Sequence, residues 1–194
     1  MVHRGHFRVG ADMFHHAKIK IDSESKKEVL EAVGENIDYF RSNMEALKGI
    51  WQLVAQKIGD CDEVRLMGKV LFSDLTPVNA AIISDNLDFF KKHYQMTAEI
   101  DENLLRITCL CGAEEITNYL LEKCHNPLQK YDFILTYVST SPNEEWVKRI
   151  ASEMHNKNME IPKGIYVFCF DSERVALIVN IFDSKQGSAS PKMK

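Results

Sequence analysis

Residues 30–58 read LEAVGENIDYFRSNMEALKGIWQLVAQKI, an unbroken four-heptad pattern. Its apolar positions alternate at intervals of three and four residues: Leu30, Val33, Ile37, Phe40, Met44, Leu47, Trp51, Val54 and Ile58. This spacing places one apolar stripe along an α-helix. The Ser25-Lys26-Lys27-Glu28 sequence before it has the form of a capping box, and Gly59 follows it as a stop. The pattern therefore predicts one long helix from Lys26 to Ile58.

The apolar stripe must be buried against this chain or against another chain. A parallel dimer selects its partner through complementary charges beside the stripe, and the flanking positions here lack them. The stripe also widens from Ile50 to Val54, which is typical of a helix inside a bundle. We expect packing within the chain, with a seam shared with a partner protein or a second copy as the alternative. In that alternative the contact residues are Leu30, Val33, Ile37 and Phe40.

Further helices are predicted between residues 62 and 123. Asp62–Phe72 has a helical pattern, and Thr76-Pro77 supplies an N-cap and a first-turn proline for a helix that continues to Tyr94. The segment Met96–Cys111 fits either a helix or a hairpin, and we favour the helix. Glu114–Lys123 is more clearly helical.

The last third of the chain predicts a small sheet. Three short runs rich in β-branched and aromatic residues have the composition of strands: Tyr131–Val138, Ile165–Phe170 and Val175–Phe182. A helix from about Ser141 to Asn156 lies between the first two, and Asp171–Arg174 would form a hairpin turn between the last two.

The expected fold class is thus α+β. A single domain would span residues 23–183, with a helical part at 23–125 and a sheet part at 126–183. Residues 1–22 are expected to form a short strand or a tail, and residues 184–194 a disordered tail.

Composition narrows the classes of function. The chain has 194 residues, 45% apolar and 27% charged, which is typical of a folded globular protein. A net charge of -4 argues against nonspecific nucleic-acid binding, which requires an excess of lysine and arginine. The sequence has neither a transmembrane run nor a secretory signal, so we expect a cytoplasmic or nuclear protein.

The five cysteines and the clustered histidines could suggest a metal centre. Cys109 and Cys111 are followed by Cys124-His125, but this spacing differs from that of structural zinc sites, and buried reduced thiols are the simpler interpretation. The N-terminal histidines His3, His6, His15 and His16 have only one carboxylate nearby. We therefore predict no metal and no cofactor.

No sequence motif indicates catalysis, so we predict that the chain is not an enzyme. The acid pairs Glu114-Glu115 and Glu144-Glu145 fall at helix starts, where carboxylates are favoured. The loop Ser139–Asn143 lacks the glycine of a phosphate site, and Lys91–Tyr94 is a cationic helix end rather than a nucleic-acid footprint.

The remaining interpretation is a non-catalytic interaction protein, an adaptor or complex subunit that binds other proteins. A small-ligand-binding or enzymatic α/β module in the C-terminal third is the alternative, and a nucleic-acid-associated factor is a weaker one. Ser190, before Pro191 in the tail, is a candidate phosphorylation site.

Overall fold

The computed structural model describes residues 25–72, 75–95, 101–122, 128–169 and 171–184. Every regular element within these ranges is an α-helix. In chain order the helices are α2 (Ser25–Val33), α3 (Ile37–Ile58), α4 (Asp62–Phe72), α5 (Pro77–Ser84), α6 (Leu87–His93), α7 (Glu102–Leu110), α8 (Glu114–Glu122), α9 (Leu128–Val138), α10 (Glu144–Asn156), α11 (Ile165–Phe168) and α12 (Ser172–Asp183). In these ranges no helix combines the length and the apolar character that a membrane span requires.

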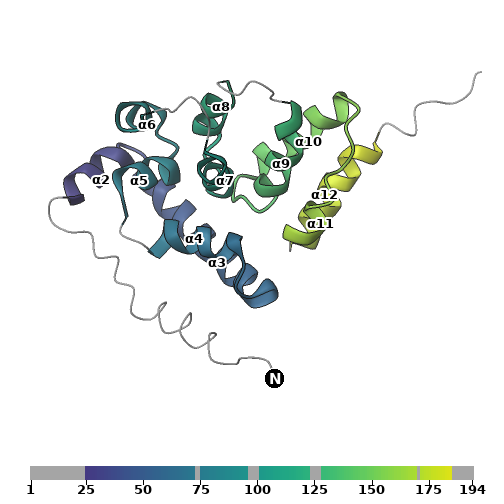
Figure 1. The fold of residues 1–194 in the computed structure, drawn as a ribbon, viewed down its shortest axis with the longest axis horizontal. Coiled ribbons are helices and arrows are strands. Elements are labelled where there is room, and N and C mark those ends of the chain that lie inside the picture. The colour runs from purple at the N-terminus through teal and green to yellow at the C-terminus, as the bar shows by residue number, and fades with distance from the viewer. Residues whose placement is uncertain (1–24, 73–74, 96–100, 123–127, 170, 185–194) are drawn as a thin grey trace, which may run out of the picture.

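The helices form a stack of pairs. Helix α5 packs with α6, α7 with α8, and α9 with α10. Between pairs, α5, α7, α9 and α11 contact one another in that order, while α6 contacts α8 and α10 contacts α12. Figure 1 shows the stack running from α2 at one end to α12 at the other, with α3 and α4 along one side. Helix α2 packs most extensively on α5, and α4 bridges α3 and α7.

The predicted α+β fold with a C-terminal sheet is wrong, because each proposed strand falls mainly within a helix. Tyr131–Val138 lies in α9, Ile165–Phe168 is α11, and Val175–Phe182 lies in α12. Asp171 does not begin a hairpin turn; its carboxylate accepts the backbone N–H groups of Glu173 and Arg174 and caps α12. Strand propensity spans only about 1 kcal/mol and depends on context, so burial of a helical stripe outweighs it.

The single helix predicted from Lys26 to Ile58 is in fact two helices. Gly34 has a φ of +59° and ends α2, and Asn36 begins α3. The predicted helix from Pro77 to Tyr94 is divided in the same way by Asp85, which has a φ of +51°. Other helix predictions are confirmed, including Thr76 as the N-cap of α5 and the helical interpretation of residues 102–110.

The junction between α5 and α6 is bonded to neighbouring helices on both sides. Ser84 Oγ and Asn86 Nδ2 both donate to the Ala32 carbonyl, at 3.1 and 3.0 Å, which connects this junction to the end of α2. The Asp85 carboxylate accepts the backbone N–H groups of Glu115 and Ile116 at 3.0 and 3.1 Å, so it caps the start of α8. Hydrogen bonds from Ser84, Asp85 and Asn86 thus link the α5–α6 junction to the end of α2 and to the start of α8.

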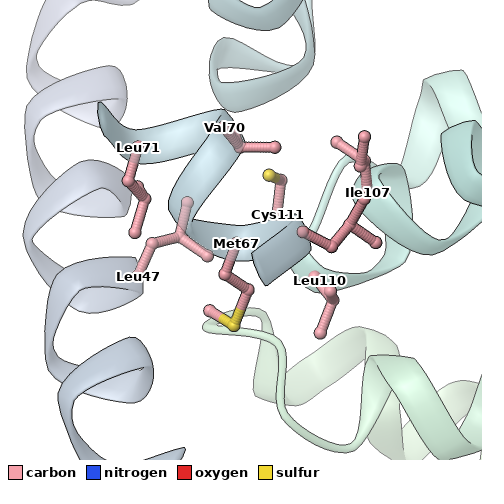
Figure 2. Close-up of a pocket in the computed structure, with 8 residues that line it drawn as sticks. Leu47, Met67, Val70, Leu71, Ile107, Leu110 and Cys111 are labelled. Atoms are coloured by element: carbon pink, nitrogen blue, oxygen red, sulfur yellow. The ribbon is translucent and has the colours of Figure 1, made fainter. Parts of the chain in front are cut away.

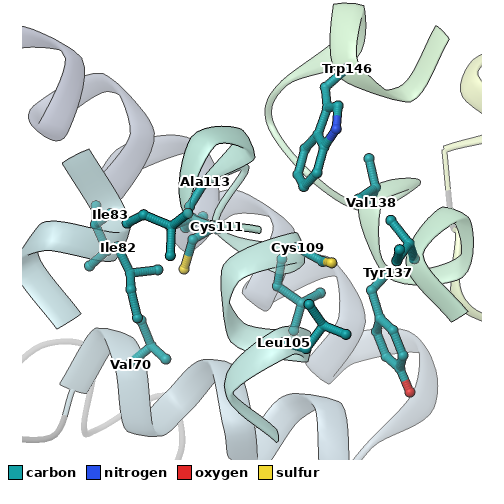
Figure 3. Close-up of a cluster of buried hydrophobic side chains, with 14 of the residues drawn as sticks. Val70, Ile82, Ile83, Leu105, Cys109, Cys111, Ala113, Tyr137, Val138 and Trp146 are labelled. Carbon is teal, nitrogen blue, oxygen red and sulfur yellow. The ribbon is translucent and has the colours of Figure 1, made fainter. Parts of the chain in front are cut away.

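One continuous apolar core runs through the stack. Figure 3 shows its central part, where side chains from α4, α5, α7, α9 and α10 converge and Trp146 inserts its ring. A buried asparagine, Asn43, lies beside this core with 5% of its surface exposed. Its side-chain amide donates to the carbonyls of Ile83 at 2.8 Å and Cys111 at 2.7 Å. Asn43 thereby joins α3 to the C-terminal ends of both α5 and α7.

Candidate binding surface

The four partner-binding residues predicted from the heptad pattern do not form one stripe. Val33 is 3% exposed and belongs to the core, and Phe40 is half-buried. Leu30, on α2, is 52% exposed, and Ile37, at the start of α3, is 38% exposed. The break at Gly34 separates these two side chains onto different helices. The middle of the pattern, by contrast, is buried within the chain through Met44, Leu47 and Val54.

A small cavity lies between α3, α4 and α7, and Figure 2 shows the side chains around it. Its lining is entirely apolar: Leu47, Leu66, Met67, Val70, Leu71, Ile107, Leu110 and Cys111. The space open to a water-sized sphere is about 10 Å³. A ligand pocket is larger by an order of magnitude and carries polar groups that orient its ligand. This cavity is therefore a packing defect of the core.

Of the cysteines proposed as core thiols, Cys109, Cys111 and Cys169 are buried, whereas Cys61 is partly exposed. Cys109 and Cys111 are free thiols, and Figure 3 shows their sulfur atoms pointing to different sides of α7. Burial raises the pKa of both thiols, that of Cys111 to about 12, so neither is a ready thiolate nucleophile. Within the described residues no group of three or more His, Cys, Asp or Glu side chains could hold a metal ion.

Cys124, His125 and the histidines His3, His6, His15 and His16 lie outside the described residues, as does Ser190.

The charged helix ends make structural contacts. Glu114 pairs with Arg149, and Glu144 lies 2.9 Å from Lys148 Nζ. At the end of α6, Lys91 lies over the ring of Tyr119.

The backbone of the Ser139–Asn143 loop is likewise engaged within the fold. Ser141 Oγ accepts the Asn143 N–H at 2.9 Å, and Asn143 caps α10 through the Trp146 N–H at 3.1 Å. Arg174 donates to the Ser141 carbonyl.

The strongest candidate for a binding surface lies where α4, α7, α9 and α11 meet. We call it the arginine cluster and define it as Glu63, Arg106, Phe133, Tyr137 and Phe168. Tyr137 is buried and the other four side chains are partly exposed. The cluster thus combines an arginine with aromatic rings at a partly exposed site, the side-chain types that are enriched in protein interfaces.

Helical spacing and helix packing bring the cluster together. Phe133 and Tyr137 are four residues apart on α9, so their rings lie side by side with centroids 4.6 Å apart. Arg106 on α7 lies over both rings, with its Cζ 5.1 Å from the Tyr137 centroid and 5.6 Å from that of Phe133. Phe168 on α11 approaches the Tyr137 ring at 6.2 Å. In the described part of the chain Arg106 forms no ion pair, and its Nε has no hydrogen-bond partner.

No family model, curated protein or solved structure matches this chain. The geometry of the molecule itself therefore carries the functional argument.

Two opposite charges act on the Tyr137 hydroxyl. Burial raises its pKa, the Arg106 charge lowers it, and the Glu63 carboxylate raises it. The hydroxyl donates a long hydrogen bond of 3.5 Å to Glu63 Oε1. The guanidinium of Arg106 thus lies over the Tyr137 ring, and the Glu63 carboxylate bonds to the tyrosine rather than to the guanidinium.

The one-turn helix α11 adds an exposed apolar surface next to the cluster. Tyr166 is 60% exposed and Val167 is 57% exposed, the highest values among the large apolar side chains of the described residues. Phe168, which belongs to the cluster, follows them directly. Gly164 lets α11 lie close to α9, since a Cβ there would meet Thr136 Cγ2 at 2.7 Å.

Sequence reasoning missed this surface for two reasons. It assigned Phe133, Tyr137 and Phe168 to strands. The spacing of Phe133 and Tyr137 could not correct this assignment, because residues four positions apart share a face in both a strand and a helix. The i, i+4 aromatic pair is a usable signal, but nothing in the sequence links it to Arg106, which lies 27 residues away.

Proposed function

We propose that this chain is a non-catalytic protein-binding module, and that it contacts its partner through the arginine cluster and the exposed end of α11. The observation that carries the proposal is the position of Arg106, stacked on two aromatic rings without an ion pair in the described residues, beside the exposed Tyr166 and Val167. Arginine and tyrosine dominate the energetics of protein interfaces.

The architecture supports this proposal. Stacks of helix pairs, in which each pair contacts mainly its neighbours, provide extended surfaces that repeat proteins use for binding. The chain also contains an internal similarity: Asn36-Ile37-Asp38-Tyr39-Phe40 begins α3 and Asn86-Leu87-Asp88-Phe89-Phe90 begins α6. Both segments follow a turn whose residue with positive φ ends the preceding helix.

The start of α5 resembles one known repeat type. Its sequence Thr76-Pro77-Val78-Asn79-Ala80-Ala81 matches the T-P-L-H-x-A signature of ankyrin repeats at the threonine, the proline and the last alanine. The roles of these residues are consistent with that signature: Thr76 Oγ1 accepts the Asn79 N–H at 3.1 Å, Pro77 occupies the first turn, and Ala81 is fully buried. The other described helix pairs lack the signature, so the similarity is confined to the start of α5.

The test is affinity purification with quantitative mass spectrometry on three proteins. They are the wild type, Tyr166→Ser/Val167→Ser, and Leu30→Ser/Ile37→Ser, which alters exposed side chains at the other end of the stack. We expect a stoichiometric partner that the first double variant loses at least tenfold and the second retains. Both variants should unfold at the wild-type temperature, because exposed substitutions change stability by about 0.5 kcal/mol or less.

Two results would contradict the proposal. One is a monomeric protein, by light scattering, that recovers no stoichiometric partner. The other is a partner lost only by Leu30→Ser/Ile37→Ser, which would place the contact at the α2–α3 end instead.

A further inference from the structure

The guanidinium of Arg106 has unused hydrogen-bonding capacity. An arginine presents five N–H donors in a planar fork, and no hydrogen bond from Arg106 to another described residue occurs. Its Nε is buried without a partner. The partly exposed guanidinium therefore keeps N–H donors that no described residue accepts.

An anionic group from a partner molecule would accept hydrogen bonds from these donors. A carboxylate matches the guanidinium fork and can accept two parallel hydrogen bonds. The rings of Phe133 and Tyr137 hold the guanidinium plane in place, so little side-chain freedom is lost when such a bond forms.

Glu63 narrows the choice of anion. Its carboxylate bonds to the Tyr137 hydroxyl, on the same ring over which Arg106 lies. A doubly charged phosphate group, or a nucleic acid with many phosphates, would be repelled by Glu63 and by a chain of net charge -4. A single carboxylate suffers least from this repulsion.

The apolar side of the site lies within reach of the same ligand. The Arg106 Cζ is 5.1 Å from the Tyr137 centroid, and the Phe168 ring lies a further 6.2 Å away. These two steps span at most roughly 11 Å, which about three to four residues of extended chain cover. A short peptide could thus place a carboxylate on Arg106 and an apolar side chain against Phe168 and Val167.

We propose that Arg106 is the recognition residue for a peptide segment of a partner protein, which carries an aspartate or glutamate within about four residues of an aromatic or aliphatic side chain. This inference rests on the proposed function and names the chemistry of its partner. Arg106 supplies the carboxylate contact, and Phe168 with Val167 supplies the apolar contact.

The probe is a phage-displayed library of random seven-residue peptides, selected on the immobilised full-length chain. An enriched peptide is then synthesised with a fluorescein label and titrated by anisotropy. We expect an acidic residue near an apolar one in the enriched sequences. Arg106→Met should weaken binding tenfold or more, and Arg106→Lys should weaken it less because it retains the charge.

A double-mutant cycle isolates the contact. Changing the peptide's acidic residue to its amide should weaken binding to the wild type by about the same factor as Arg106→Met does, and should add little when the protein already carries Arg106→Met. Additive losses would show that the two groups do not meet and would overturn the inference.

Stability separates recognition from a structural role. Arg106→Met keeps the volume and places a thioether on the two rings, so we expect an unfolding temperature at or above that of the wild type. A large fall in this temperature would mean that Arg106 holds the fold together, and would overturn the inference.

The remaining outcomes distinguish the inference from the function on which it rests. If the enriched peptides lack a carboxylate but bind more weakly to Tyr166→Ser/Val167→Ser, the proposed role of Arg106 is refuted. The proposed binding surface around α11 is then retained. No enriched peptide, together with no effect of that double variant on partner capture, refutes both. Binding of a labelled single-stranded oligonucleotide that Arg106→Met abolishes would assign the site to nucleic acid instead.

Discussion

The bond network of Asn43 offers the sharpest test of how the stack is held together. Asn43 is 5% exposed, and its amide donates to two carbonyls, Ile83 O at 2.8 Å and Cys111 O at 2.7 Å. Both carbonyls lie at helix C-termini, where intrahelical donors are missing. Asn43→Ala removes the donor and leaves both acceptors buried.

The expected loss follows from the cost of unsatisfied acceptors. Each buried carbonyl without a donor costs about 1–3 kcal/mol, so the loss of both bonds in Asn43→Ala should lower the free energy of unfolding by about 2–6 kcal/mol. For a chain of this size that corresponds to a fall in the unfolding temperature of roughly 4–24 °C. Urea titration followed by circular dichroism and tryptophan fluorescence measures it. Asn118→Ala, at an exposed position of α8, is the matched control and should change stability by less than about 0.5 kcal/mol.

Asn43→Asp gives the same test a pH dependence. An ionised carboxylate at this position would face two carbonyl oxygens, so its pKa in the folded state must be raised above the unfolded value of about 3.9. The variant is then most stable below that value and loses stability as the pH rises through the raised pKa, where the proton that could donate one bond is lost. The reasoning would be refuted if Asn43→Ala unfolds within about 0.5 kcal/mol of the wild type, or if Asn43→Asp is as stable at pH 7 as at pH 4.

Four further predictions concern other parts of the stack. Gly164→Ala should lower the free energy of unfolding by about 1–3 kcal/mol, because the added Cβ would clash with Thr136. In urea titrations, the double variant Gly164→Ala/Thr136→Ala should recover most of this loss. If Gly164→Ala unfolds like the wild type, α11 does not approach α9 so closely. Asp85→Ala should be less stable than Asp85→Gly by about 1 kcal/mol, although alanine is the better helix former. The reason is that Asp85 has a φ of +51°, a left-handed conformation that strains a residue with a Cβ but not glycine. Equal stabilities of the two variants would exclude this backbone strain. Burial also raises the pKa of Asp85, so the stability of the wild type relative to Asp85→Asn should fall as the pH rises above about 4; a constant difference between pH 4 and 7 would contradict it. Cys109 and Cys111 should resist iodoacetamide at pH 8 in the native protein and react on unfolding, as measured by peptide mass spectrometry; rapid native labelling would show that these thiols are accessible.

Local signals in the sequence predicted helix boundaries where a nearby side chain forms the cap. Thr76-Pro77 correctly predicted the start of α5, because threonine bonds a backbone N–H within one turn. The two breaks at Gly34 and Asp85 were missed, because an apolar stripe can continue in register across a short turn. The repeated Asn-x-Asp-x-Phe pattern at Asn36 and Asn86 was the signal that could have located both breaks.

In the last third of the chain, residue composition alone did not distinguish helices from strands. Val175, Ile178 and Phe182 follow the i, i+3, i+7 spacing of a helix, and Ile178 and Phe182 are buried in α12. The same residues are β-branched or aromatic, and strand propensity alone misassigned them. Packing of α12 on α10 buries the helical stripe, and that contact joins segments that the local pattern does not relate.

By itself, the sequence determined the composition of the protein, the absence of known catalytic motifs and the starts of several helices, because these depend on residue types and on bonds within about one turn. Only the tertiary structure decided that the chain stacks as helix pairs, that Asn43 joins two helix ends, and that Arg106 lies on the rings of α9 without an ion pair in the described residues. These features depend on contacts between residues 27 to 68 positions apart, from Arg106 and Phe133 to Asn43 and Cys111. Residues so far apart meet only when the whole stack has folded, and neither propensity nor periodicity encodes which of them will.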